Sequence, residues 1–254
     1  MPDSNGFVQR LVDLVKNKKF ADYIKDSPET VAESLRGRHV FVSAEFGEGE
    51  PEPGQSKVGG KPDLPEKVAW PAEYDSESPL AFIAQINLAE VHPHDLVGRL
   101  PEKGMLWFFT IADGDRAYGE GIDEATSALL YDANPGPLSP REIPAELDEN
   151  EYAMIEERAL EFGAAISLSG YHDRGITDRI VDALREIGGR YGPVHMLTKH
   201  HAEDGSEMVS LIDMNGYEIS SDVFIEGILE FVLSDADLAA GKLELASCKF
   251  TPGT

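Results

Sequence analysis

The chain of 254 residues has little cysteine, few basic residues and no long apolar run. Cys248 is the single cysteine, which excludes an intramolecular disulfide framework and a zinc site made of cysteines alone. No apolar run approaches the roughly 18 to 20 residues that a membrane-spanning helix needs. The first residues, MPDSNGFVQR, lack the apolar stretch of a secretory signal, so none is predicted. These absences predict a cytoplasmic protein.

Basic residues are few: the chain has 22 Lys and Arg but 47 Asp and Glu, which gives a formal net charge of −25. Such a surface repels phosphate backbones and anionic lipids, so neither nucleic acid nor a membrane is an expected partner. Two interpretations remain. The acids keep the chain in solution, or they steer a basic protein partner, such as a toxin or nuclease domain, into place.

The hydrophobic pattern predicts helices in the first forty residues, since Val8, Leu11, Val12 and Val15 recur at helical spacing within residues 7–18. A second helix begins after Ser27, a capping residue followed by proline, and ends before residue 37. A short strand is predicted over residues 39–42. The acidic, proline-rich residues 47–56 then form an exposed loop.

The rest of the chain is predicted to be rich in strands, with one further helix. Residues 135–149 carry four prolines and many acids, which favours a linker. The helix covers residues 177–187. Apolar runs between turn residues predict strands over residues 80–88, 104–112, 125–131, 159–168, 207–214, 227–233 and 242–250. Ser234, three residues before Asp237, caps a turn between the last two strands.

The stretch from Ser56 to Thr110 carries the most specific pattern. It reads SKVGGKPDLPEKVAWP, then PLAFIAQINL, then LPEKGMLWFFT. This order of a glycine pair, a loop with a tryptophan, a Gln-Ile-Asn-Leu strand and a glycine-led aromatic strand resembles the YwqG-like proteins of bacteria. The resemblance implies an α+β fold made of duplicated β-rich halves. Members usually carry a glutamine in the second-half strand and a Trp-Gly-Asp element after it, where this chain has residues 211–213 and 223–225.

Three elements of the sequence recur in the same order at nearly one offset. Residues 104–108 align with 227–231 at an offset of 123, residues 80–88 with 207–215 at 127, and residues 59–60 with 188–189 at 129. This favours gene duplication. We therefore predict a single domain over residues 1–254 with an internal repeat of about 56–112 and 188–250. A cleft between the halves is the expected place for a ligand or partner.

The candidate ligand-binding residues lie in the signature. Gly59 and Gly60, beside Lys57, could hold an anion because glycine amides approach phosphate closely, or could form a tight turn. Gln85 and Asn87 alternate on one strand and so share a face. Their amides could line a polar cleft with Trp70, or could bind backbone groups of a neighbouring loop.

No residue pattern predicts catalysis, a metal or a cofactor. His92 and His94 flank a proline, and His195, His200 and His201 form a looser group, but neither shows a third convergent ligand. No GxSxG nucleophile pattern is present. Cys248 lies in an apolar strand, which is typical of a core residue.

The sequence thus predicts an α+β fold of duplicated β-rich halves packed together, with N-terminal helices. We expect a non-catalytic protein-binding module, neutralising a basic effector through Glu48–Glu52 and Glu146–Glu157. The alternative is a binder of a small ligand or metabolite that uses the cleft between the halves. An enzyme with an unrecognised site ranks below both, and the oligomeric state is open.

Overall fold

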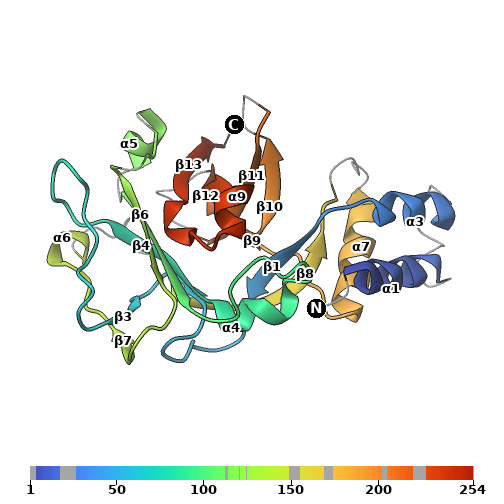
Figure 1. Cartoon of the computed structure of the whole chain (residues 1–254), viewed down its shortest axis with the longest axis horizontal. Helices are drawn as coiled ribbons and strands as arrows, with labels where there is room; N and C mark the ends of the chain where they lie inside the picture. Colours follow the sequence, from blue (N-terminus) through green and yellow to red (C-terminus); the bar gives the residue numbers. More distant parts are fainter. Residues whose placement is uncertain are drawn as a thin grey trace.

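The computed structural model describes residues 4–17, 27–111, 114–119, 121–123, 125–148, 155–168, 174–201, 205–219 and 227–253. A large antiparallel sheet dominates the molecule, and helices α1, α3 and α7 gather at one end beyond β1 and β8 (Figure 1). The helices are α1 (Ser4–Lys16), α3 (Pro28–Arg36), α4 (Leu88–Val91), α5 (Gly114–Gly119), α6 (Ala145–Asp148), α7 (Arg174–Glu186), α8 (Gly216–Ile219) and α9 (Asp235–Ala239), with 3-10 turns η1 (His92–His94) and η3 (Leu243–Leu245).

The sheet has eleven strands, and its order is β13-β12-β11-β9-β1-β8-β2-β4-β5-β6, with β10 paired to β11. It curls until its two ends face each other and is nearly closed. A small separate sheet pairs β3 with β7. The strands are β1 (Val40–Phe46), β2 (Lys57–Val58), β3 (Asp63–Pro65), β4 (Ala81–Asn87), β5 (Met105–Thr110), β6 (Ser127–Asp132), β7 (Leu138–Pro140), β8 (Arg158–Ile166), β9 (Val194–Met196), β10 (Thr198–His201), β11 (Glu207–Asn215), β12 (Gly227–Ser234) and β13 (Ser247–Pro252).

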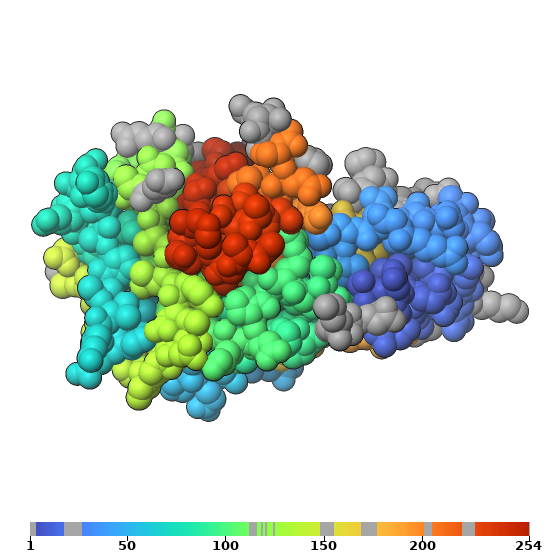
Figure 2. All heavy atoms as spheres, viewed as in Figure 1, coloured from blue at the N-terminus to red at the C-terminus, as the bar shows by residue number. Residues whose placement is uncertain are grey.

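The predicted N-terminal helices are confirmed. The Ser27 hydroxyl accepts a hydrogen bond from the Thr30 amide at 3.2 Å, and Pro28 follows where no amide donor is needed. The apolar face of α1, including Leu11 and Val12, packs with α3, α7 and the ends of β1 and β8 in a cluster of its own. These helices project as a separate lobe beside the sheet (Figure 2, blue).

The main core lies inside the curled sheet. The rings of Phe108 on β5 and Phe231 on β12 meet there edge to face, with centroids 5.0 Å apart. Side chains alternate across a strand, so Trp107 points to the opposite face of β5. That face is also covered, because the Trp107 indole N–H donates to the Asp63 carbonyl at 2.9 Å. The segment that follows β2, from Gly59 to Pro65, therefore packs on the outside of the first half of the sheet.

Three predicted elements differ from the structure. Residues 242–250 are not one strand, because Leu243–Leu245 form η3 before β13 begins. Residues 135–149 are not a plain linker, since β7 and α6 lie within them and β7 pairs with β3. The strand after residue 39 extends to Phe46, because its later residues pair with β8 and β9.

The strand order reads the same way from both ends. Outward from β1 the order is the short strand β9, then β11, β12 and β13. Outward from β8 it is the short strand β2, then β4, β5 and β6. The pairing of β4 with β5 shifts register between Phe82 and Ala84, and that of β11 with β12 shifts between Ser210 and Ile212. These two irregularities lie 128 residues apart in the sequence.

Candidate functional site

Lys57, the charged residue of the signature, lies inside the protein. Its side chain is 4% exposed, and its ammonium group is 2.9 Å from a Glu157 carboxylate oxygen and 3.4 Å from Asp63 Oδ2. Asp63 is fully buried. The lysine therefore neutralises a carboxylate that the fold has removed from water, which is a structural contact.

Gln85 extends the same network from the next strand, where it is the register partner of Lys57. Its amide nitrogen donates to Asp63 Oδ2 and to the Gln55 carbonyl, both at 2.7 Å, and its amide oxygen accepts from the Asp63 amide at 2.8 Å. All three bonds hold the loop that covers the sheet. The sequence left two roles open for this amide, lining a cleft or bonding to a neighbouring loop. The contacts described here correspond to the second role.

Asn87 lies on the same face and serves two neighbours. Its amide nitrogen donates to the Gly54 carbonyl at 3.0 Å, and its oxygen accepts from the Ala89 amide at 3.1 Å, which caps α4. Asn215 at the end of β11 does the same for α8, accepting from the Tyr217 amide at 3.2 Å. The two asparagines lie 128 residues apart, the offset of the register shifts.

The glycine pair forms a tight turn against the segment that enters β8. Gly59 has φ +65° and Gly60 has φ +66°, a conformation that favours glycine. A Cβ on Gly59 would lie 2.3 Å from the Ile155 carbonyl oxygen, which leaves no room for any other residue. The Gly60 amide donates to that same oxygen at 2.9 Å. The turn is occupied by protein on this side.

The two tryptophans of the chain differ in burial, since Trp107 is 1% exposed and Trp70 is half-buried. Trp70 stacks edge to face on Phe109 and donates to the Leu80 carbonyl at 2.8 Å. Part of its ring remains at the surface because it is carried by a loop. The signature residues Lys57, Gly59, Gly60, Gln85 and Asn87 therefore lie together, with Trp70 further along the same covering segment.

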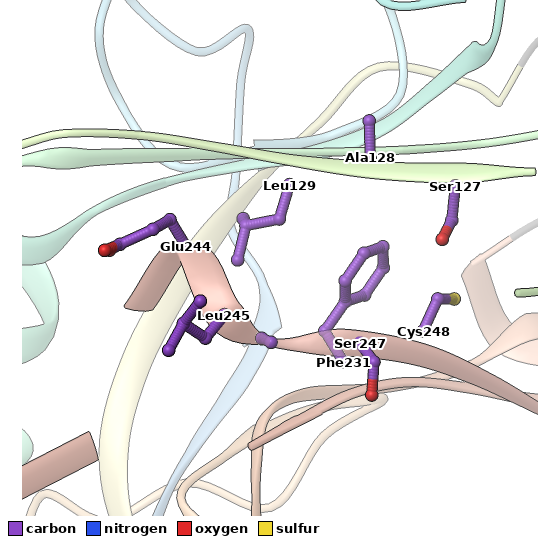
Figure 3. Close-up of a pocket in the computed structure, with 9 residues that line it drawn as sticks. Ser127, Ala128, Leu129, Phe231, Glu244, Leu245, Ser247 and Cys248 are labelled. Carbon is purple, nitrogen blue, oxygen red and sulfur yellow. The ribbon is translucent and has the colours of Figure 1, made fainter. Parts of the chain in front are cut away.

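A cavity of about 310 Å³ lies where the two ends of the curled sheet face each other. We call this place between β6 and β13 the seam. Leu129 and Phe231 point into the cavity, and Ser127 and Cys248 lie close together at one end (Figure 3). Glu244 and Leu245 of η3 lie at the other end. The sequence predicted Cys248 as a core residue but indicated no site here, because the seam joins segments more than one hundred residues apart.

Carboxylates surround the seam. Burial raises the pKa of Tyr131 on β6, and the nearby charges of Glu244 and Asp132 raise it further. Burial likewise raises the pKa of the Cys248 thiol, and the charges of Glu230 and Asp123 raise that pKa further. Four carboxylates, those of Asp123, Asp132, Glu230 and Glu244, thus act on groups at the seam, and their charge favours cationic groups.

The Cys248 thiol should be unreactive in the folded protein. Burial raises its pKa to about 12, so at pH 8 about one thiol in ten thousand is ionised, against roughly a quarter for a free cysteine. We expect alkylation by iodoacetamide at pH 8 to be at least one hundredfold slower in native protein than in 6 M guanidinium. Mass spectrometry would measure the rates. Rapid alkylation of the native protein would contradict the burial of this residue.

His200, which the sequence grouped loosely with His195 and His201, instead lies against Ser210 on β11 and Glu230 on β12. His200 Nε2 lies 2.6 Å from Ser210 Oγ and 3.2 Å from a Glu230 oxygen, and Ser210 donates to Glu230 at 2.9 Å. A charge-relay triad needs the serine and the acid on different ring nitrogens. Here both approach Nε2, so this arrangement does not activate the serine.

Within the described ranges, no group of three or more His, Cys, Asp or Glu side chains is arranged to hold a metal ion. The His92 and His94 pair forms η1, where burial lowers the pKa of His94 and Arg190 lowers it further. None of the helices described here is both long and apolar enough to cross a membrane.

Comparison with known protein families identifies the family of this chain. A family model described as Domain of unknown function (DUF1963) matches residues 56–249, from the start of the signature to β13. The match covers most of the chain, so this protein belongs to that family. A search of curated proteins finds no match.

Proposed function

We propose that this protein is a non-catalytic binding module that takes a basic protein partner at the seam. The observation that carries the proposal is the pair of strand edges, β6 and β13, at the two ends of the sheet, with the carboxylates of Asp132 and Glu244 nearby. It is supported by the net charge of −25, which attracts a basic protein from a distance. The protein would act inside the cell, where the partner is neutralised by being held.

The edge of β6 suits an extended segment of such a partner. An edge strand presents unpaired N–H and C=O groups that another strand can pair with. Every residue of β6 is half-buried, and Ala128, Leu129 and Leu130 make it apolar. Edges like this are normally shielded by charge or proline, as β13 is by Lys249 and Pro252. We infer that β6 pairs with the partner.

We further propose that the two sides of the sheet are duplicated halves, as the YwqG-like resemblance implies. The matching strand order and the register shifts at one offset support this. Gln85 pairs in register with Lys57, and Asp213 pairs with His195 in the corresponding strands β11 and β9. Asp213 thus stands where the resemblance implies a glutamine, so the second half has lost that amide. Residues 223–225 lie outside the described residues.

A salt-dependent binding experiment tests the proposed partner. Asp132→Asn with Glu244→Gln removes two charges at the seam, and we expect it to weaken capture of a basic partner from host lysate by about fivefold. Association should slow as salt rises, because charges are screened beyond about 8 Å at physiological salt, while dissociation changes less. Surface plasmon resonance with the purified partner would measure both rates.

Two control variants locate the effect. Glu29→Gln with Asp178→Asn removes the same charge from exposed positions on α3 and α7 and should leave binding unchanged. Glu48→Gln with Glu50→Gln and Glu52→Gln tests the exposed loop that the sequence indicated, while residues 149–154 of the second indicated segment lie outside the described residues. If all three variants lost the same amount of partner binding, the acidic residues would act only as a general surface charge. That result would refute a site at the seam.

The seam cavity also supports the alternative function, a small-ligand binder between the halves. Leu129 and Phe231 offer apolar walls in a space of about 310 Å³, the low end of the usual range for ligand sites. A ligand-binding role for Lys57, Gly59, Gly60, Trp70, Gln85 and Asn87 remains a prediction. Binding of a small molecule that excludes the basic partner would favour this alternative.

A further inference from the structure

A second cavity, of about 450 Å³, shares no lining residue with the seam. It lies between the start of β1, the end of β8, the loop after α7, and strands β9 and β10. Its volume falls within the usual range for small-molecule sites. The residues that decide its chemistry are His39, Phe41, Tyr191, His195, Thr198 and Lys199.

Aromatic rings form the walls of this cavity. Phe41 is at the centre, with its ring centroid 5.1 Å from His195, 6.3 Å from Tyr191 and 6.4 Å from His39. Tyr191 and His195 also contact each other, with centroids 5.4 Å apart. These four rings can pack against a planar ring of a ligand, since aromatic pairs favour offset and edge-to-face packing.

The lining of the cavity differs in charge from the chain as a whole, although the Asp213 carboxylate lies behind it, 3.8 Å from His195. Among the described residues that line it, none carries a carboxylate, although acids outnumber bases about two to one overall. Lys199 is exposed at its mouth, and its ammonium group has no ion-pair partner among the described residues. An unpaired lysine beside an aromatic pocket favours an anionic group on the ligand.

The polar groups around the rings add donors for such a ligand. Burial raises the pKa of Tyr191, and Asp213 and Glu218 raise it further, so its hydroxyl stays protonated and can donate. Burial lowers the pKa of His39, as do Lys199 and Arg99, although its hydrogen bond to the Leu197 carbonyl at 2.7 Å opposes them. This imidazole is neutral and adds no charge.

His195 presents an unsatisfied nitrogen. Its Nδ1 lies 3.8 Å from an Asp213 oxygen, whereas Nε2 is buried with no hydrogen-bond partner within the described structure. Asp213 approaches from the Nδ1 side and does not line the cavity. Because Nε2 is buried, it is not exposed to the cavity, so we assign the ligand a contact with the imidazole ring of His195 and no hydrogen bond to this nitrogen.

The first half of the sheet contrasts with this arrangement. Lys57 on β2 stands in the strand order where His195 stands on β9, and its charge is already neutralised by Asp63 and Glu157. A loop of the protein fills that position. Around His195 the corresponding position borders an open cavity, and Lys199 at that cavity has no ion-pair partner among the described residues.

We propose that this cavity binds a small aromatic carboxylate, with its ring against Phe41 and Tyr191 and its carboxylate at Lys199. This site goes beyond the proposed seam and is independent of it. A basic protein partner has neither the charge nor the shape for it.

Titration of the full chain with sodium benzoate and with benzamide, followed by amide NMR shifts, tests the proposal. Benzamide has nearly the same shape without the charge. We expect benzoate to shift amides of β1, β9 and β10 and to bind at least fivefold more tightly than benzamide. Lys199→Gln should weaken benzoate about fivefold, near the upper end for an exposed ion pair, and leave benzamide unchanged.

Lys242→Gln is the matched control, because this exposed lysine lies near Asp237 on α9, away from the cavity. It should leave both affinities unchanged, as should the seam variant Asp132→Asn with Glu244→Gln. Equal binding of the two probes, an unchanged benzoate affinity in Lys199→Gln, or shifts confined to Ser127 and Cys248 would overturn the proposal. So would the absence of any shift at 10 mM benzoate. None of these results depends on whether a basic protein binds the seam.

Discussion

Replacing Trp107 by alanine is expected to lower the free energy of unfolding by about 3 to 5 kcal/mol. The side chain is 1% exposed and lies in the middle of β5, between β4 and β6. Its removal leaves a cavity under the covering loop, and the Asp63 carbonyl loses the indole hydrogen bond of 2.9 Å. Urea denaturation of the purified variant, followed by circular dichroism, would measure the loss.

Two further variants separate packing from hydrogen bonding at this position. Trp107→Phe keeps most of the apolar contact and should lose about 1 to 2 kcal/mol, chiefly from the unpaired carbonyl. Trp70→Ala should lose less than Trp107→Ala because the Trp70 side chain is only partly buried. A loss below about 1 kcal/mol for Trp107→Ala would show that the loop does not cover this face of the sheet.

Lys57→Met should be almost as damaging, with an expected loss of about 3 to 5 kcal/mol. The change leaves the Asp63 carboxylate fully buried without its cation. Its Oδ1 already lacks a hydrogen-bond partner among the described residues, so the remaining bonds from Gln85 and Gly54 to Oδ2 must hold the charge alone. Denaturation at pH 7 would measure the effect.

Lys61→Met is the natural control for this experiment. Lys61 is four residues away and pairs with Glu142 at 2.8 Å, but its side chain is 44% exposed and that of its partner 84%. Exposed pairs contribute about 0 to 1 kcal/mol. Adding Asp63→Asn to Lys57→Met should recover part of the loss, since it removes the unpaired charge. Similar losses for the two lysines would contradict the buried network.

These two experiments also bear on the signature residues as a candidate site. Lys57 and Gln85 were indicated by the sequence because a lysine, a glycine pair and two amides could line a cleft. In the structure the polar groups of both side chains are engaged by Asp63, Glu157 and the covering loop. A stability loss without any change in ligand binding is the result that a purely structural role predicts.

The sequence alone determined most of the local structure, because the signals are local. The helix after Ser27 follows from a capping hydroxyl and a proline, and β4, β5, β11 and β12 follow from apolar runs between turn residues. Short strands escaped prediction. Pairing with a neighbouring strand is the only reason that three short segments are strands, namely Lys57–Val58, Val194–Met196 and Thr198–His201. Such pairing leaves little trace in the hydrophobic pattern of two to four residues.

Tertiary structure alone decided where chemistry can occur. The charge of −25 is a property of composition, but its concentration at the seam depends on bringing β6 and β13 together across the curl of the sheet. Likewise, Tyr191, His195 and Lys199 lie within one stretch of nine residues, but Phe41 is about 150 residues away, and no spacing rule connects the two. Composition fixes how many carboxylates and rings there are. Long-range packing fixes which of them become buried, paired or left open to a ligand, because burial and pairing depend on neighbours in space.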